Sequence, residues 1–150
     1  MDKSHLTAIS RKTLPLPTRW LLKQGVIQGR VLDFGCGKCH AINPKKWDNY
    51  DPHFHPRNFT LLDRWDTIIC NYVLCVLPNS ERPFILKQIQ SLLSLNGMAM
   101  ISVRNDKPIQ GWGTSKRGTY QGRVSKLPLR QIYKCPQFRT YILTKTTVLI

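Results

Sequence analysis

The stretch RVLDFGCG, residues 30–37, decides the fold class of this chain. Its valine and leucine suit a short strand that is covered on both faces of a parallel sheet. Gly35 and Gly37 then allow the backbone to turn sharply and to approach a ligand closely. Asp33 lies at the strand end, and a second acidic residue, Asp51, follows the next short hydrophobic stretch. This layout predicts a nucleotide-type pocket at the carboxyl edge of an α/β sheet. The alternative is an ordinary glycine turn, with both aspartates as capping or turn residues.

The flanking segments predict a compact, mostly parallel sheet with helices on its faces. Residues 17–24 should form a helix that ends at Gly25. The second strand is minimal, at residues 49–51, and Pro44 disrupts any helix before it. We therefore expect a shortened first crossover, with at most one or two helical turns.

Two further strands are predicted at residues 67–72 and 98–103, each rich in apolar residues. Between them, Asn79 or Ser80 can cap a helix whose apolar residues recur with helical spacing. This helix should stop at Asn96-Gly97, because glycine favours helix ends. The alternation of strands and helices supports the α/β class.

The motifs of residues 30–106 resemble those of class I S-adenosylmethionine-dependent methyltransferases. VLDFGCGK, residues 31–38, is similar to their motif I, two hydrophobic residues followed by Asp-x-Gly-x-Gly-x-Gly. Three further landmarks follow in the family's order: the acidic residue after strand 2, the strand 4 motif, and strand 5 after its glycine turn. They occupy residues 50–53, 65–74 and 97–103. The resemblance implies one Rossmann-like domain that binds S-adenosylmethionine and transfers its methyl group.

The same resemblance implies roles for particular residues. The domain would consist of an arm and helix, a cofactor-binding core, and a basic loop with terminal strands, at residues 1–29, 30–106 and 107–150. Cofactor contacts are implied for Asp33, Gly35, Cys36, Gly37, Asp51, Asn71 and Tyr72. Asp33 would orient the glycine loop, and Asp51 would accept hydrogen bonds from the ribose hydroxyls. Asn71 and Tyr72 would face both the methionine part and the substrate, and they are the catalytic candidates.

The chain departs from the family pattern at two points. Cys39 replaces the third glycine of motif I, and the first crossover is short. A methyltransferase-fold nucleic-acid-binding protein without catalysis therefore remains an alternative, as does an anti-restriction protein that degrades the cofactor. The segment 71–74 lacks the prolines typical of enzymes that methylate amino groups of DNA bases, and no Pro-Cys pair of cytosine C5 enzymes occurs.

The amino-terminal segment resembles a more specific group. Residues 5–11, His-Leu-Thr-Ala-Ile-Ser-Arg, with Pro17 and Arg19 downstream, are similar to the lead-in of methyltransferase-like proteins associated with DNA phosphorothioation systems and of their short phage or bacterial relatives. Residues 71–74 share this resemblance. It implies a setting in DNA or RNA handling.

The charge of the chain also indicates a nucleic-acid partner. The chain has 23 Lys and Arg against 8 Asp and Glu, a net charge of +15, and no carboxylate follows Asp106. Such a field attracts polyanions, so DNA or RNA is the predicted partner; a merely solvated basic face is the alternative. Residues 138–144 alternate well enough for a strand in this region, and residues 146–150 are its expected partner strand.

The glycine-rich segment 111–122 is the predicted substrate-binding loop. Trp112 and Tyr120 could stack on a base while Lys116 and Arg117 meet phosphate. The alternative is a surface loop without a ligand.

Five cysteines, no export signal and no membrane-spanning apolar run predict reduced thiols in the cytoplasm of a bacterium or of a virus-infected host. Cys36-Gly-Lys-Cys39-His40 matches the pattern for c-type haem attachment, and the cysteines have metal-ligand spacing. With His53 and His55 they could supply four zinc ligands. The strand-glycine pattern already accounts for the first half of this motif, so we expect neither haem nor metal.

Overall fold

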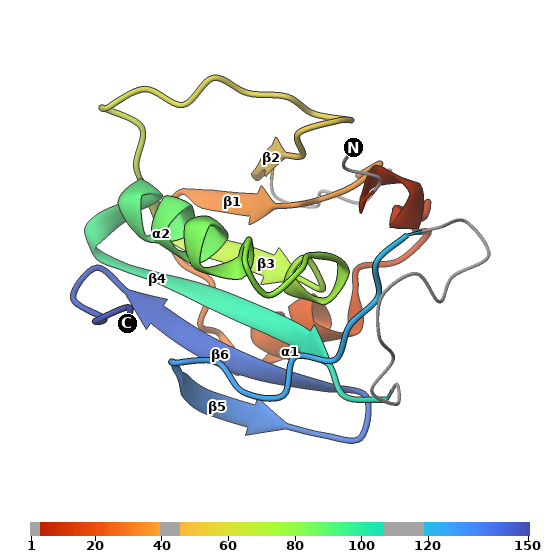
Figure 1. Ribbon diagram of the computed structural model, residues 1–150. Helices are drawn as coiled ribbons and strands as arrows, with labels where there is room; N and C mark the ends of the chain where they lie inside the picture. Colours follow the sequence, from red (N-terminus) through yellow and green to blue (C-terminus); the bar gives the residue numbers. More distant parts are fainter. Residues whose placement is uncertain (1–3, 40–45, 107–118) are drawn as a thin grey trace.

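The computed structural model describes residues 4–39, 46–106 and 119–150, which form one six-stranded sheet (Figure 1). The strand order is β2-β1-β3-β4-β6-β5. The strands are β1 (Val31–Phe34), β2 (Asp48–Tyr50), β3 (Trp65–Asn71), β4 (Leu93–Arg104), β5 (Arg130–Lys134) and β6 (Phe138–Thr144). β1 to β4 run parallel, and β6 is antiparallel to both β4 and β5. The predicted mostly parallel α/β sheet is confirmed.

Alternate strand residues point to opposite sides of the sheet, so both faces carry apolar side chains. In the described part of the chain, one helix covers each face. On one face, Leu21 of α1 (Leu16–Gln24) packs with Val31, Ile69 and Met100. On the other face lies α2 (Arg82–Leu92) (Figure 1). Its Ile89 and neighbouring apolar residues pack into the larger core cluster. The predicted first helix is confirmed, together with its end at Gly25, which has a left-handed φ of 68°.

The prediction for the second helix was wrong at both ends. α2 ends at Leu92, and Leu93 is already extended as the first residue of β4. Leu93 pairs with Trp65 while Met98 pairs with Thr67, so a bulge absorbs the residues between them. At the other end the cap position is Glu81 and no side chain caps it.

The prediction of a terminal strand at residues 146–150 was also wrong. β6 pairs instead with β5, a strand that the sequence analysis did not predict. The Thr144 amide donates to Thr147 Oγ1, so a turn ends β6 at that point. β5 reads Arg-Gln-Ile-Tyr-Lys, which is too polar to stand out as a strand without its partner.

The connections around β2 contain little regular structure. The described residues between β1 and β2, 35–39 and 46–47, contain no helix. The rest of this crossover, which we expected to be short, lies outside the described residues. Residues 51–64, between β2 and β3, hold only turns, single-residue bridges and irregular backbone (Figure 1). Within the described ranges, no helix is both long and apolar enough to span a membrane.

Candidate functional site

The order in which the strands are added to the sheet reverses between β1 and β3. From β1 the chain moves outward to β2 on one side and then returns to β3 on the other. The connections at the carboxyl ends of these strands therefore diverge, and open α/β sheets bind ligands in the crevice that results. A cavity of about 1020 Å³ lies there, lined by the turn after β1, the loop after β2, the end of β3 and the amino-terminal arm.

The glycine turn is shaped by packing and by its own hydrogen bonds. Gly35 has φ +77°, and a Cβ at this position would collide with a methyl group of Val73. The amides of Gly35 and Cys36 both donate to the carbonyl oxygen of Tyr50, at 2.7 and 3.0 Å. Packing against Val73 thus explains why residue 35 is glycine without reference to a ligand. The amides of Gly35 and Cys36 already have an acceptor in the protein.

Asp51 holds the two segments that line this side of the cavity. Its Oδ2 accepts a hydrogen bond from the Gly37 amide at 3.1 Å, and its Oδ1 accepts from the amides of His53 and Phe54 at 2.9 and 3.0 Å. Each carboxylate oxygen can accept more than one hydrogen bond. The predicted contact to ribose therefore stays a prediction, beside an observed role in organising the turn.

The Asp33 side chain lines the same cavity, and no hydrogen bond joins its carboxyl to another residue in the described part of the chain. Burial raises the pKa of its carboxyl to about 7, against the opposing effect of the Arg11 guanidinium. A buried carboxyl without hydrogen-bond donors gains most from a cation placed beside it.

Asn71 and Tyr72 lie at the carboxyl end of β3, as predicted, and both line the cavity. The Asn71 amide nitrogen donates to Thr18 Oγ1 on α1 at 2.7 Å, while its Oδ1 is buried without a described partner. Tyr72 has φ +65°, a strained conformation for a non-glycine residue that concentrates at functional sites. Arg11 lies over its ring, 6.0 Å from the centroid. Burial raises the pKa of the Tyr72 phenol, so the phenol stays protonated at neutral pH.

The described lining of the cavity is more acidic than the molecule as a whole, with four acidic residues against two arginines, Arg11 and Arg104. Four of the eight acidic residues of this chain line it, although the net charge is +15. They are Asp33, Asp51, Glu81 and Asp106. Asp106 is paired with Arg104 at 2.9 Å. The cavity is therefore suited to a ligand that carries positive charge.

The amino-terminal arm is the part of the site that the sequence analysis missed. Residues of the 3₁₀ helix η1 (Ser4–Thr7) and of the segment up to Leu16 form one wall of the cavity. His5 stacks on His53 of the loop after β2, with ring centroids 4.1 Å apart. The similarity of residues 5–11 to a known lead-in was the only signal, because the arm has no periodic pattern.

The predicted substrate residues are mostly untested. Trp112, Lys116 and Arg117 lie outside the described residues. Tyr120 is half-buried and is not among the described residues that line the cavity, whereas its neighbour Gln121 is.

The basic carboxyl-terminal region divides into two kinds of cation. Arg139 is buried and donates to the carbonyl oxygens of Val124 and Ser125. Lys145 Nζ donates to carbonyls at the end of α2, among them Ser91 and Leu93 at 3.1 Å. These two cations are structural. Exposed side chains in this region belong to Arg123, Lys126, Arg130 and Lys134.

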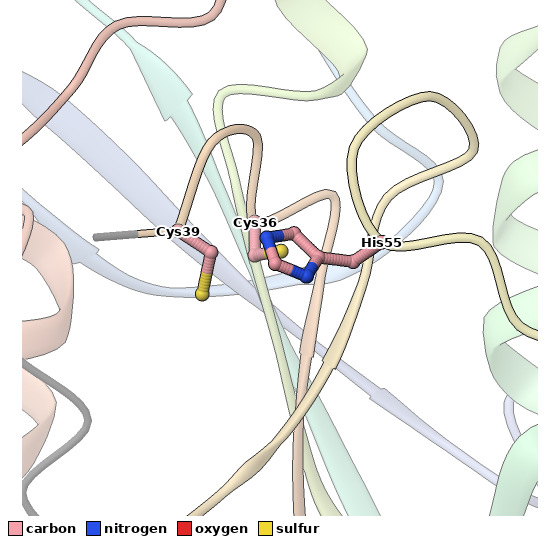
Figure 2. Close-up of side chains that lie close together, drawn as sticks. All are labelled: Cys36, Cys39 and His55. Atoms are coloured by element: carbon pink, nitrogen blue, oxygen red, sulfur yellow. The ribbon is translucent and has the colours of Figure 1, made fainter. Parts of the chain in front are cut away.

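Three of the four side chains considered as zinc ligands lie together. Cys36, Cys39 and His55 each offer an atom within 4.8 Å of the others (Figure 2). His53 is not in this group, because its ring stacks on His5 instead. Burial raises the pKa of both thiols.

The sheet order and the cavity at its switch point define an open, mostly parallel α/β fold. No protein-family model and no curated protein matches the sequence. Among solved structures, the glycopeptide N-methyltransferase MtfA complexed with sinefungin is similar, with a TM-score of 0.43 and 13% sequence identity. The match covers 94% of this chain and 77% of that protein.

Proposed function

We propose that this chain binds S-adenosylmethionine in the switch-point cavity and acts as a methyltransferase. The observation that carries the proposal is the acidic lining of the cavity in a strongly basic protein. S-adenosylmethionine carries a sulfonium and an ammonium group, and both are positive. A cavity that held an anionic nucleotide would be expected to carry an excess of cations. The described lining has four acidic residues against two arginines, Arg11 and Arg104.

Each cavity residue has a role that follows from its chemistry. The Asp33 carboxyl pairs with a cationic group of the cofactor, which relieves the cost of burying it. Asp51 accepts from the ribose hydroxyls with the lone pairs left over from the glycine turn.

When bound, the cofactor supplies a methyl group made electrophilic by the positive sulfur. The protein's task is to hold the acceptor in line with that methyl group and to exclude water. We assign this role to Tyr72 and Asn71, because both line the cavity at the end of β3. Because the Tyr72 phenol stays protonated, it donates a hydrogen bond to the acceptor and does not remove a proton from it.

The acceptor that we propose is nucleic acid. Support comes from the net charge of +15, from the four exposed cations in and before β5, and from the resemblance of the arm to proteins associated with DNA phosphorothioation. These features fit a polyanion held by its phosphates.

A second candidate is a methyltransferase-fold protein that binds nucleic acid without catalysis. The observation that favours it is the saturated glycine turn, whose three amides at residues 35–37 already donate within the protein. Cys39, in place of the third glycine, has a left-handed φ of 45°. Both features limit how closely a cofactor approaches this turn.

Calorimetry at pH 6 and pH 8 tests cofactor binding. With S-adenosylmethionine we expect affinity to rise by about tenfold at the higher pH, because Asp33 must be ionised to pair with a cation. Asp33→Asn should bind weakly and with little dependence on pH. Asp63→Asn removes an acid outside the cavity and should behave as the wild type. No binding at millimolar cofactor would contradict the proposal.

Transfer of a labelled methyl group separates the functional alternatives. Incorporation into DNA or RNA supports the methyltransferase. Cofactor binding without incorporation or breakdown supports the non-catalytic protein. Breakdown of the cofactor in the absence of any acceptor would indicate a cofactor-degrading enzyme instead.

A further inference from the structure

We infer that Cys36, Cys39 and His55 form a zinc site that braces the glycine turn after β1. Figure 2 shows the two cysteine side chains on one turn and the His55 ring beside them, contributed by the loop after β2. All three ligand atoms lie within 4.8 Å of one another. Two thiolates and an imidazole are a zinc donor set, and two cysteines separated by two residues have the spacing of zinc ligands.

The backbone around the cysteines places both sulfurs on the same side. The Cys39 amide donates to the Cys36 carbonyl at 3.3 Å, which closes a turn over the two residues between them. Gly37 and Cys39 in this turn both have left-handed backbone, with φ of 63° and 45°. Tetrahedral zinc separates its sulfur and nitrogen ligands by roughly 3.5–3.8 Å, given its usual bond lengths. Small side-chain rotations would therefore bring the three groups onto one ion.

Asp51 fixes the third ligand relative to the first two. Its backbone exchanges two hydrogen bonds with His55, at 3.1 and 3.0 Å, and its side chain accepts from the Gly37 amide inside the cysteine turn. His55 Nε2 lies 3.4 Å from the Lys38 carbonyl oxygen. When Nε2 donates to this carbonyl, Nδ1 is the nitrogen left to bind a metal.

The position of the cluster suggests why the protein would need it. The turn after β1 and the loop after β2 line the same cavity and are joined by hydrogen bonds of Asp51. A metal that joins these two segments would hold this wall of the cavity in place. Cys36 and Cys39 line the cavity, whereas His55 is not among its described lining residues. The site would thus lie at the rim, with its fourth position open to water.

Metal analysis of the full chain, purified with reductant, tests the inference without any activity assay. We expect about one zinc per chain by mass spectrometry of the metal. Cobalt substitution should give the thiolate charge-transfer and visible bands of a tetrahedral site. Cys36→Ser and Cys39→Ser should lose the metal. His55→Ala should weaken zinc binding by more than the roughly 10–100-fold that is lost when a residue hydrogen-bonded to a metal ligand is removed.

Matched controls keep the result interpretable. Cys135→Ser and His53→Ala remove a free cysteine elsewhere and a neighbouring histidine outside the cluster, and both should retain zinc. Circular dichroism identifies any variant that fails to fold. Titration of zinc into folded His55→Ala then shows whether His55 is a zinc ligand. No zinc-dependent signal in the reduced wild type would overturn the inference. A mass loss of two hydrogens that marks a Cys36–Cys39 disulfide in the metal-free chain, with no zinc binding after reduction, would overturn it as well.

Discussion

The two halves of the sheet are built in different ways. On the β1–β2 side, short strands are joined by irregular connections, and positive φ values occur at Gly35, Gly37, Cys39 and Tyr72 around the cavity. On the β4–β6–β5 side, β4 and β6 pair without interruption over seven residues, β5 pairs with β6 with one register shift, and exposed cations lie in and before β5. The strained backbone is concentrated at the cavity, to which both sides contribute acidic residues, whereas the β4–β6–β5 side supplies the long strand pairing and the exposed positive charge. The following predictions test that division.

The largest effect is expected from Gly35→Ala. A Cβ there would meet Val73, and φ is +77°. Overpacking and left-handed strain together should cost about 2–5 kcal/mol of the free energy of unfolding. Gly25→Ala is the matched control, because its φ is +68° but nothing lies within 4 Å of the added carbon. It should cost only about 1–2 kcal/mol, measured by denaturant unfolding. Equal losses in both variants would show that Val73 yields easily and that the turn is less constrained than its packing indicates.

The second prediction concerns the regular half. Arg139→Met keeps the apolar stem but removes donors to Val124, Ser125 and the Tyr141 hydroxyl. These buried acceptors would lose a partner, so we expect a loss of about 1–3 kcal/mol. Arg123→Met, at an exposed position, should change stability by less than about 0.5 kcal/mol. A more stable Arg139→Met would mean that burying this charge costs more than its hydrogen bonds return.

The third prediction follows from the pKa of Asp33, which burial raises to about 7 from its ordinary value of 3.8. The folded protein therefore retains a proton that the unfolded chain loses, and this contribution to stability fades as pH rises from about 4 through 7. Asp33→Asn should remove this loss of stability with rising pH, because asparagine does not ionise. Without ligand, this variant should be more stable than the wild type at pH 8, by on the order of 4 kcal/mol, and nearly equal to it at about pH 3, where the carboxyl is protonated in both states.

Asp66→Asn provides a control of opposite sign. Hydrogen bonds from the Arg30 amide and from Ser94 lower the pKa of Asp66. Its contribution is therefore present at neutral pH and lost as pH falls through the lowered value. Thermal unfolding from pH 3 to pH 8 distinguishes the two variants. If Asp33→Asn changed stability equally at all pH values, the Asp33 carboxyl would not be titrating as a buried group.

The sequence was sufficient for much of this fold because its strongest signals are local. The pattern of residues 30–37 predicted β1 and its turn, and apolar runs predicted β3 and β4. Gly25 ends α1 through its own backbone preference. In each case the residues that form the element also carry the signal.

The other parts of the fold and of the site depend on contacts between residues that are far apart in the sequence. β5 is identified as a strand only by pairing with β6, and Leu93 leaves its helix because Trp65 pairs with it. The amino-terminal arm forms a wall of the cavity although its residues have no period. His55 is brought beside the two cysteines by the Asp51–His55 bridge, which the sequence did not predict. Spacing alone suggested four ligands, and the strand-glycine pattern led us to expect no metal.

The smallest effect is expected from the exposed cations Arg123, Lys126, Arg130 and Lys134. If they hold phosphates, Arg130→Ala should lower the slope of log affinity against log salt by about one, with thermal stability unchanged. Fluorescence anisotropy with labelled DNA and RNA measures the slope. Lys145→Ala is the contrasting control: it should leave the slope unchanged and lower stability, because Lys145 binds carbonyls at the end of α2. If substitution of all four exposed cations left the slope intact, any nucleic acid would contact another surface, and the positive charge of this half of the sheet would not serve binding.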